Sequence, residues 1–301
     1  MRSPFTRPVT IIIVIFVVIV LGVLALLIFS GKAPEVAPVA EVKILEPIHK
    51  IIGKSVEGRD IDSYTYVSAK ADKTATTSLV FVGGIHGGYE WNSVSLAYLF
   101  KDYLDANPDV IPKNITVTVI PSANPDGVYK VTGKEGRFVI SDVSMDKKVL
   151  ASGRFNAHEV DLNRNFDCKW QPKSTWQQKT VSAGAKPFSE PESEALRSFI
   201  LENNPTAVIF WHSQSNGVYA SQCEKGILPE TLELMNTYAK ASGYPAVKSF
   251  DAYATTGAAE DWLASISIPA ITVELSTHET IEWEMNLEGI KALLKYYEGR
   301  T

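Results

Sequence analysis

The stretch Leu79-Val-Phe-Val-Gly-Gly-Ile-His-Gly-Gly-Tyr-Glu90 predicts a buried strand that ends in a glycine-rich turn. Its apolar run is typical of a strand covered on both faces, and glycine permits a sharp turn directly after it. A second strand-like run, Val208-Ile-Phe-Trp-His-Ser-Gln214, carries His212 near its end. Two histidines and one carboxylate are common protein ligands of a hydrolytic zinc site. We therefore expect His86, Glu90 and His212 to hold a zinc ion if the fold brings them together.

Strand-like and helix-like runs alternate along the rest of the chain. Short runs rich in β-branched residues predict strands at 78–85, 115–121, 206–211 and 270–275. Amphipathic runs predict helices at 92–104, 190–202, 228–242, 258–265 and 287–297. The alternation predicts an α/β domain with a central mixed, mostly parallel sheet and helices on both faces. The polar region 131–176 is expected to form long loops, and such loops build the site in α/β folds.

Residues 9–29 form an almost wholly apolar run without charge. About 20 such residues can cross a bilayer as a helix. Arg2 and Arg7 precede the run, and only Lys32 follows it closely. The positive-inside rule then predicts a cytoplasmic N-terminus and an exported remainder. The lipid bilayer is therefore an expected partner, through a single helix.

The expected organisation is a cytoplasmic N-terminus, a transmembrane signal anchor, a linker and a catalytic domain, at 1–8, 9–29, 30–42 and 43–301. Cleavage within the linker is the alternative, and it would give a secreted protein. Either way, the domain lies outside the cytoplasm, where an even pair of cysteines predicts a disulfide. The two cysteines are Cys168 and Cys223. Two unrelated buried thiols are the alternative interpretation.

Composition excludes some classes of function. The chain has 301 residues, of which 45% are hydrophobic, so it can bury the core of one large domain. Its net charge is −5, and it has no dense run of lysine and arginine. Nucleic acid is therefore not an expected partner. Composition does not indicate an oligomeric state.

Further residues suit the hydrolysis of a peptide's C-terminal bond. Glu274, at the end of a predicted strand, could be the general base that takes a proton from water. Asn163 and Arg164 could hold the terminal carboxylate, because the planar arginine fork matches a carboxylate. Arg154 could stabilise the oxyanion, and Tyr253 could hydrogen-bond the bound substrate. Together with a zinc site, these residues predict a peptidase.

The chain resembles the zinc metallocarboxypeptidases of the funnelin, or carboxypeptidase A-like, family. Seven stretches carry the resemblance, in the family's order: Gly83–Glu90, Asn124–Gly127, Arg154–Ala157, Asp161–Asn165, Phe188–Glu192, His212–Ser213 and Thr272–Leu275. The stretch Ile52–Arg59 also resembles a segment that opens many bacterial members. The resemblance covers nearly all of residues 43–301 and implies a zinc carboxypeptidase-like α/β fold.

The resemblance also implies roles for individual residues. It implies one zinc ion bound by His86, Glu90 and His212, a general base and acid at Glu274, carbonyl polarisation by Arg154, carboxylate binding by Asn163 and Arg164, a mobile tyrosine at Tyr253 and a substrate contact at Ser213. One spacing departs from the family's pattern. The family's glutamate follows its histidine by three residues, whereas Glu90 follows His86 by four. We expect the glycines at 87 and 88 to absorb the extra residue in a loop.

Two further residues have open interpretations. Glu260 lies where the family sets its preference for the departing side chain, and an acid there would favour a basic partner. Its neighbour Asp261 could take that place instead, and either acid could simply stabilise a helix start. His278 follows Glu274 by four residues. It could line the cleft, but it lies in none of the matching stretches.

These observations predict a membrane-anchored, extracytoplasmic zinc metallocarboxypeptidase that acts on peptides. A peptidase that trims cell-wall peptides at γ-D-glutamyl-diamino acid bonds is the alternative within enzymes. An alternative of another class is a catalytically silent binding module.

Overall fold

The structure is a computed structural model, and it describes residues 46–68 and 77–300. In this part of the chain, no helix combines the length and the apolar character needed to cross a membrane. The expected anchor at 9–29 and linker at 30–42 lie outside the described residues. The expected catalytic domain, 43–301, is described except for residues 43–45, 69–76 and 301.

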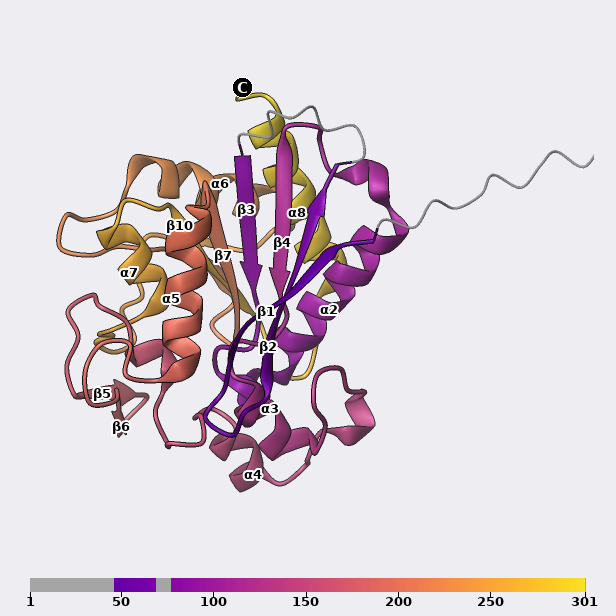
Figure 1. Cartoon of the computed structure of the whole chain (residues 1–301). Coiled ribbons are helices and arrows are strands. Elements are labelled where there is room, and N and C mark those ends of the chain that lie inside the picture. The colour runs from indigo at the N-terminus through magenta and orange to yellow at the C-terminus, as the bar shows by residue number, and fades with distance from the viewer. Residues whose placement is uncertain (1–45, 69–76, 301) are drawn as a thin grey trace, which may run out of the picture. The chain divides into compact units, whose positions relative to one another are not determined.

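Eight strands form a mixed sheet at the centre of the fold (Figure 1). They are β1 (Ile48–Lys54), β2 (Asp60–Val67), β3 (Thr77–Val82), β4 (Ile115–Ile120), β7 (Ala207–Ser213), β8 (Gly217–Ala220), β9 (Ala246–Val247) and β10 (Ala270–Leu275). Their order across the sheet is β1-β2-β4-β3-β7-β10-β8-β9. The four inner strands, β4, β3, β7 and β10, run parallel to one another. These are the four strands that the sequence predicts, so the expected α/β fold with a mostly parallel central sheet is confirmed.

Helices cover both faces of the sheet, as expected. On one face lie α2 (Trp91–Ala106), α6 (Pro229–Ser242) and α8 (Trp283–Glu298). On the other face lie α5 (Pro191–Asn203) and α7 (Ala259–Ser265). In Figure 1, α5 crosses in front of the sheet, and α2 and α8 lie behind it.

Strand β3 shows why the sequences of the inner strands are continuous apolar runs. Leu79 and Phe81 belong to the core under α2, α6 and α8, whereas Val80 and Val82 belong to the core under α5 and α7. Successive side chains of a strand point to opposite faces, so a strand covered on both faces needs apolar residues at every position. This double burial fixes the centre of the sheet and therefore the edge at which the inner strands end.

The region 131–176 is largely irregular, as predicted, but it also contains regular pieces. The short helix α3 (Pro125–Thr132) leads into it, and α4 (Lys147–Ser152) lies within it. A small antiparallel hairpin, β5 (Lys173–Trp176) and β6 (Lys179–Ser182), closes it. A disulfide joins Cys168 to Cys223 across 55 positions of sequence. It ties this region to the segment that follows β8.

Candidate active site

Three inner strands deliver polar side chains to one edge of the sheet. His212 lies near the carboxyl end of β7, and Glu274 lies near the carboxyl end of the parallel strand β10. Their Cα atoms are directly paired in the sheet. His86 follows the carboxyl end of β3 by four residues. Because parallel strands end at the same edge, residues far apart in the sequence meet there.

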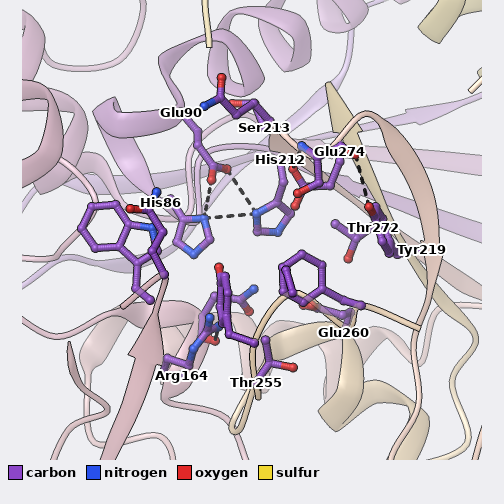
Figure 2. Close-up of a pocket in the computed structure, with 18 of the residues that line it drawn as sticks. His86, Glu90, Arg164, His212, Ser213, Tyr219, Thr255, Glu260, Thr272 and Glu274 are labelled. Carbon is purple, nitrogen blue, oxygen red and sulfur yellow. Dashed lines mark hydrogen bonds and ion pairs between the residues drawn. The ribbon is translucent and has the colours of Figure 1, made fainter. Parts of the chain in front are cut away.

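His86, Glu90 and His212 converge in a buried group (Figure 2). The Nδ1 atom of His86 lies 2.7 Å from Oε1 of Glu90, and Nδ1 of His212 lies 3.1 Å from Oε2. The two Nδ1 atoms are 3.2 Å apart. One ligand atom from each residue lies within 4.8 Å of the others. The structure therefore brings together the three residues that the sequence predicts as metal ligands.

The extra residue between His86 and Glu90 is taken up by a short 3₁₀ helix, Gly87–Glu90. Gly87 has a φ angle of 47°, in the left-handed region that favours glycine. A Cβ atom on Gly88 would lie only 2.5 Å from the side chain of Val131. Both glycines are thus required where the sequence suggested, and Glu90 reaches the histidines despite the longer spacing.

The electrostatics of this group favour a carboxylate among two imidazoles. Burial acts to raise the pKa of Glu90, but His86 and His212 outweigh it and hold that pKa well below its usual range. Burial likewise acts to lower the pKa of His212, but the carboxylate of Glu90 raises it to about 9. A buried cation between these atoms would meet one ionised oxygen donor and two ring nitrogens, which is the donor set that zinc prefers.

Asp161 supplies a second test of the fit to zinc. Its Oδ1 atom lies 3.4 Å from Nε2 of His86, the ring nitrogen that faces away from Glu90. A ligating histidine usually presents its other nitrogen to a carboxylate, which fixes the orientation of the ring. Arg154 and Arg164 hold the pKa of the fully buried Asp161 carboxyl far below its usual range, against the effect of burial. The surroundings of His86 therefore fit a zinc ligand, although the sequence alone assigned no role to Asp161.

Glu274 is placed as a base beside the metal-binding group. Burial raises its pKa to about 7, against the opposing charge of His212. Its Oε2 atom accepts a hydrogen bond from the backbone N–H of Ser215, at 3.1 Å. A carboxylate with a pKa near neutrality can both take up and release a proton at physiological pH.

Asn163 and Arg164 form a fixed pair at the other side of the cavity. Oδ1 of Asn163 accepts a hydrogen bond from the backbone N–H of Ala259, at 2.8 Å. The Arg164 guanidinium donates to the backbone oxygens of Asn163 and Thr175. Both side chains are buried yet line the cavity. Anchored in this way, their remaining N–H groups form a preorganised donor set for a carboxylate.

Arg154 lies between the metal-binding group and an aromatic wall. Its Nε donates to Oδ2 of Asp161 at 2.8 Å, and its Nη1 lies 3.9 Å from Oε1 of Glu90. The guanidinium stacks over Trp176, 4.8 Å from the ring centroid. These contacts hold the arginine side chain beside the predicted zinc site, where it can face a developing negative charge.

Glu260 and Asp261 place two acids at one end of the cavity. Oδ1 of Asp261 accepts a hydrogen bond from the backbone N–H of Gln222, at 2.9 Å. Burial, together with the charge of Glu260, raises the pKa of Asp261 to about 7. Oε2 of Glu260 is buried and has no hydrogen-bond partner among the described residues. An unpaired buried carboxylate oxygen is costly unless a ligand satisfies it, so this end of the cavity suits a cation.

The predicted site residues come together in a single cavity of about 300 Å³. Its lining includes His86, Glu90, Arg154, Asn163, Arg164, His212, Ser213, Tyr253, Glu260 and Glu274. The cysteine pair does not line it. Tyr253 is half-buried and packs against Phe250, with ring centroids 4.9 Å apart. Burial raises the pKa of Tyr253, so its hydroxyl is a hydrogen-bond donor at neutral pH.

The cavity is also lined by residues to which the sequence gave no role, among them Tyr89 and Trp176, and by His278. His278 was expected to line the cleft only as an alternative. Tyr89 lies in the sequence between a predicted turn and a predicted ligand, so no pattern distinguishes it from a core aromatic. Trp176 belongs to the hairpin β5–β6, which the sequence analysis did not predict.

Comparison with known proteins relates the chain to one family. The family model described as zinc carboxypeptidase matches residues 46–295. The chain is 30% identical over 190 residues to carboxypeptidase B of Astacus astacus, covering 60% of this chain and 56% of that protein. It is 27% identical over 176 residues to gamma-D-glutamyl-L-diamino acid endopeptidase 1 of Lysinibacillus sphaericus, covering 54% and 42%. The chain thus spans about half the length of these curated relatives.

A solved structure shows the same fold. The crystal structure of the murein-tripeptide amidase from Escherichia coli O157 matches with a TM-score of 0.58 and 22% sequence identity. The match covers 86% of this chain and 96% of that one. At this identity, the likeness supports the architecture of the sheet and helices.

Proposed function

The chain belongs to the zinc carboxypeptidase family, and from that premise we propose that it is a metallocarboxypeptidase that removes single residues from the C-terminus of peptides. The family membership confirms the resemblance and makes zinc the expected cofactor. The observation that carries the proposal is the position of Asn163 and Arg164, a fixed donor pair inside the cavity that holds the metal-binding group. Such a pair suits the free carboxylate that distinguishes the last residue of a peptide.

Each residue has one task in the proposed reaction. When bound, zinc polarises the scissile carbonyl and lowers the pKa of water. Glu274 takes the proton of the attacking water and passes it to the departing amine, for which its pKa near 7 is suited. Arg154 stabilises negative charge on the carbonyl oxygen, and Asn163 and Arg164 fix the terminal carboxylate. Tyr253 hydrogen-bonds the bound peptide.

The carboxylate clamp is tested with peptides that differ only at their last group. For the wild-type protein, we expect kcat/KM to be roughly 10- to 100-fold higher for a free acid than for its amide, the worth of a charge-assisted hydrogen bond. In the Arg164→Gln variant, kcat/KM should fall for the free-acid peptide and stay nearly unchanged for the amide, so most of the preference disappears. Equal hydrolysis of acid and amide by the wild-type protein would contradict the exopeptidase assignment.

We expect the departing residue to carry a positive charge, because Glu260 lines the cavity and its buried Oε2 has no partner in the part of the chain that the structure describes. Replacing Glu260 with glutamine should lower kcat/KM for a C-terminal lysine by roughly 10- to 100-fold and leave a C-terminal leucine little affected. Asp251→Asn is the matched control, since Asp251 is exposed and does not line the cavity. If the Glu260→Gln variant keeps the lysine preference, Glu260 does not recognise the charged side chain, and either Asp261 or neither acid does.

The preference for lysine should also depend on pH. Asp261 is neutral below its pKa of about 7 and negative above it. Lysine keeps its charge throughout this range. The ratio of kcat/KM for lysine to that for leucine should therefore rise as pH passes upward through about 7. Other ionisations of the enzyme affect both substrates equally, so they cancel in the ratio. In the Asp261→Asn variant, the ratio should not rise with pH.

A cell-wall peptidase is a second candidate within the same chemistry. The relative from Lysinibacillus sphaericus is named for gamma-D-glutamyl-L-diamino acid bonds. An acidic end of the cavity would also suit the second amino group of a diamino acid. Hydrolysis of a γ-D-glutamyl-diamino acid peptide at a higher kcat/KM than an α-linked peptide ending in lysine would favour this candidate.

We also propose an extracytoplasmic location, with the apolar run 9–29 as a signal anchor and residues 43–301 as the catalytic domain. The disulfide between Cys168 and Cys223 supports this proposal, because disulfides persist in oxidising compartments. Protease protection of the domain in intact cells, with exposure only after lysis, would contradict it.

A further inference from the structure

Tyr89 and His278 form a pair in the wall of the cavity. Their ring centroids lie 4.5 Å apart, and Tyr89 also packs edge-on against Trp176, at 5.1 Å. Tyr89 occupies the last position before Glu90, within the four-residue spacing that departs from the family's pattern. The reaction proposed above uses neither ring.

A chain of hydrogen bonds determines which nitrogen of His278 carries a proton. Nδ2 of Asn92 donates to the backbone oxygens of Thr277 and Thr280, at 2.7 and 2.9 Å, so its Oδ1 is the acceptor atom. Ser213 donates its hydroxyl proton to that Oδ1, at 3.0 Å. The same hydroxyl lies 2.6 Å from Nδ1 of His278 and must accept there. Nδ1 of His278 is therefore the donor.

The other ring nitrogen of His278 is consequently an acceptor. In a neutral imidazole that is protonated on Nδ1, the Nε2 atom carries the free lone pair. Burial acts to lower the pKa of His278, which favours the neutral ring. No described residue makes a hydrogen bond to Nε2. The cavity wall thus contains an acceptor that has no partner among the described residues and is open to a ligand.

The position of this acceptor relative to the carboxylate clamp indicates the part of a peptide that would meet it. Figure 2 shows Glu90 and Ser213 on one side of the two histidine rings, and Arg164 and Glu260 on the other. His278 hydrogen-bonds Ser213, which this view shows on the side of the rings away from Arg164. If the clamp holds the departing residue, the peptide on the amino side of the scissile bond runs toward His278.

We propose that Tyr89 and His278 form a subsite for the residue that contributes the scissile carbonyl. Nε2 of His278 accepts a hydrogen bond from the amide N–H of that residue, and the rings of Tyr89 and Trp176 pack against its side chain. This inference rests on the proposed carboxypeptidase function. It makes the enzyme selective for substrates with a hydrogen-bond donor at that position.

The test uses two N-acylated dipeptides that end in lysine and differ only by N-methylation of the penultimate amide. The measured quantity is the selectivity ratio, which is kcat/KM for the N–H peptide divided by kcat/KM for the N-methyl peptide. This ratio should be roughly tenfold higher for the wild-type protein than for a variant without the acceptor. Two variants divide the functions of the ring. His278→Asn keeps a donor to Ser213 but places no acceptor at Nε2, and should show a ratio near one. His278→Gln places an amide oxygen near Nε2 and should retain much of the selectivity.

Different outcomes overturn different claims. The proposed subsite would be wrong if the selectivity for the N–H peptide is unchanged in His278→Asn, or if it disappears only in His278→Gln. Either result would mean that His278 acts solely by holding Ser213. Hydrolysis of neither peptide by the wild-type protein would count against the proposed function instead. In that case, the dissociation constants of both peptides on the zinc-loaded Glu274→Gln protein decide the subsite, because binding does not require turnover. Equal affinities there would overturn it.

Discussion

Replacing Glu274 with glutamine is expected to lower kcat by about 10²- to 10⁴-fold, the usual contribution of a general base. The amide has nearly the same shape as the carboxyl, but it cannot take a proton from water. Steady-state kinetics on a peptide that ends in lysine measure the loss. The zinc content should stay unchanged, since the metal-binding group consists of His86, Glu90 and His212.

The matched control is Glu202→Gln, which removes an exposed carboxylate at the end of α5, away from the cavity. This variant should retain the wild-type kcat. A Glu274→Gln protein that is folded, zinc-loaded and as active as the control would refute Glu274 as the base.

Replacing Glu90 with alanine is expected to abolish zinc binding. The change removes the only carboxylate in the metal-binding group and leaves two imidazoles around a buried space. Without the metal, kcat/KM should fall by about 10³-fold or more, because a metal supplies several kcal/mol of transition-state stabilisation. Elemental analysis of the purified variant, followed by kinetics with added zinc, measures both effects.

A graded variant separates ligation from general damage. Asp161→Asn leaves all three metal ligands in place but weakens the orientation of His86 and the contact with Arg154, so its zinc affinity should fall by about 10- to 100-fold, less than in Glu90→Ala. A Glu90→Ala protein that keeps a full complement of zinc would show that the longer spacing after His86 excludes Glu90 from the metal.

The sequence predicted the centre of the sheet better than its edges. Strands β3, β4, β7 and β10 are buried on both faces, so their apolar runs are unbroken and easy to detect. The edge strand β1 is mostly exposed, and β9 has two residues, so neither has a strong apolar pattern. The five predicted helices were placed within a few residues, except that α8 begins four residues earlier than expected, and the short helices α3 and α4 were not predicted.

At the site, the sequence identified the residues that belong to motifs but not those that act through position. His86 follows a buried strand, and His212 and Glu274 lie near the carboxyl ends of two others, so their meeting could be predicted from the parallel sheet. Tyr89 and His278 meet only because a 3₁₀ turn and the loop after β10 fold against each other. No sequence periodicity predicts that contact, because Tyr89 lies in a single 3₁₀ turn and His278 lies in a loop.

A mass-spectrometric digest of a mixed peptide pool by the zinc-loaded protein tests the proposed carboxypeptidase activity most directly. The pool includes free acids, their amides and cell-wall peptides, and the Glu274→Gln protein is run beside the wild type. We expect stepwise loss of single C-terminal residues from the free acids, basic residues first, and no loss with the variant. No cleavage of any peptide by a folded, zinc-loaded protein would contradict the proposed peptidase activity and favour a catalytically silent binding module.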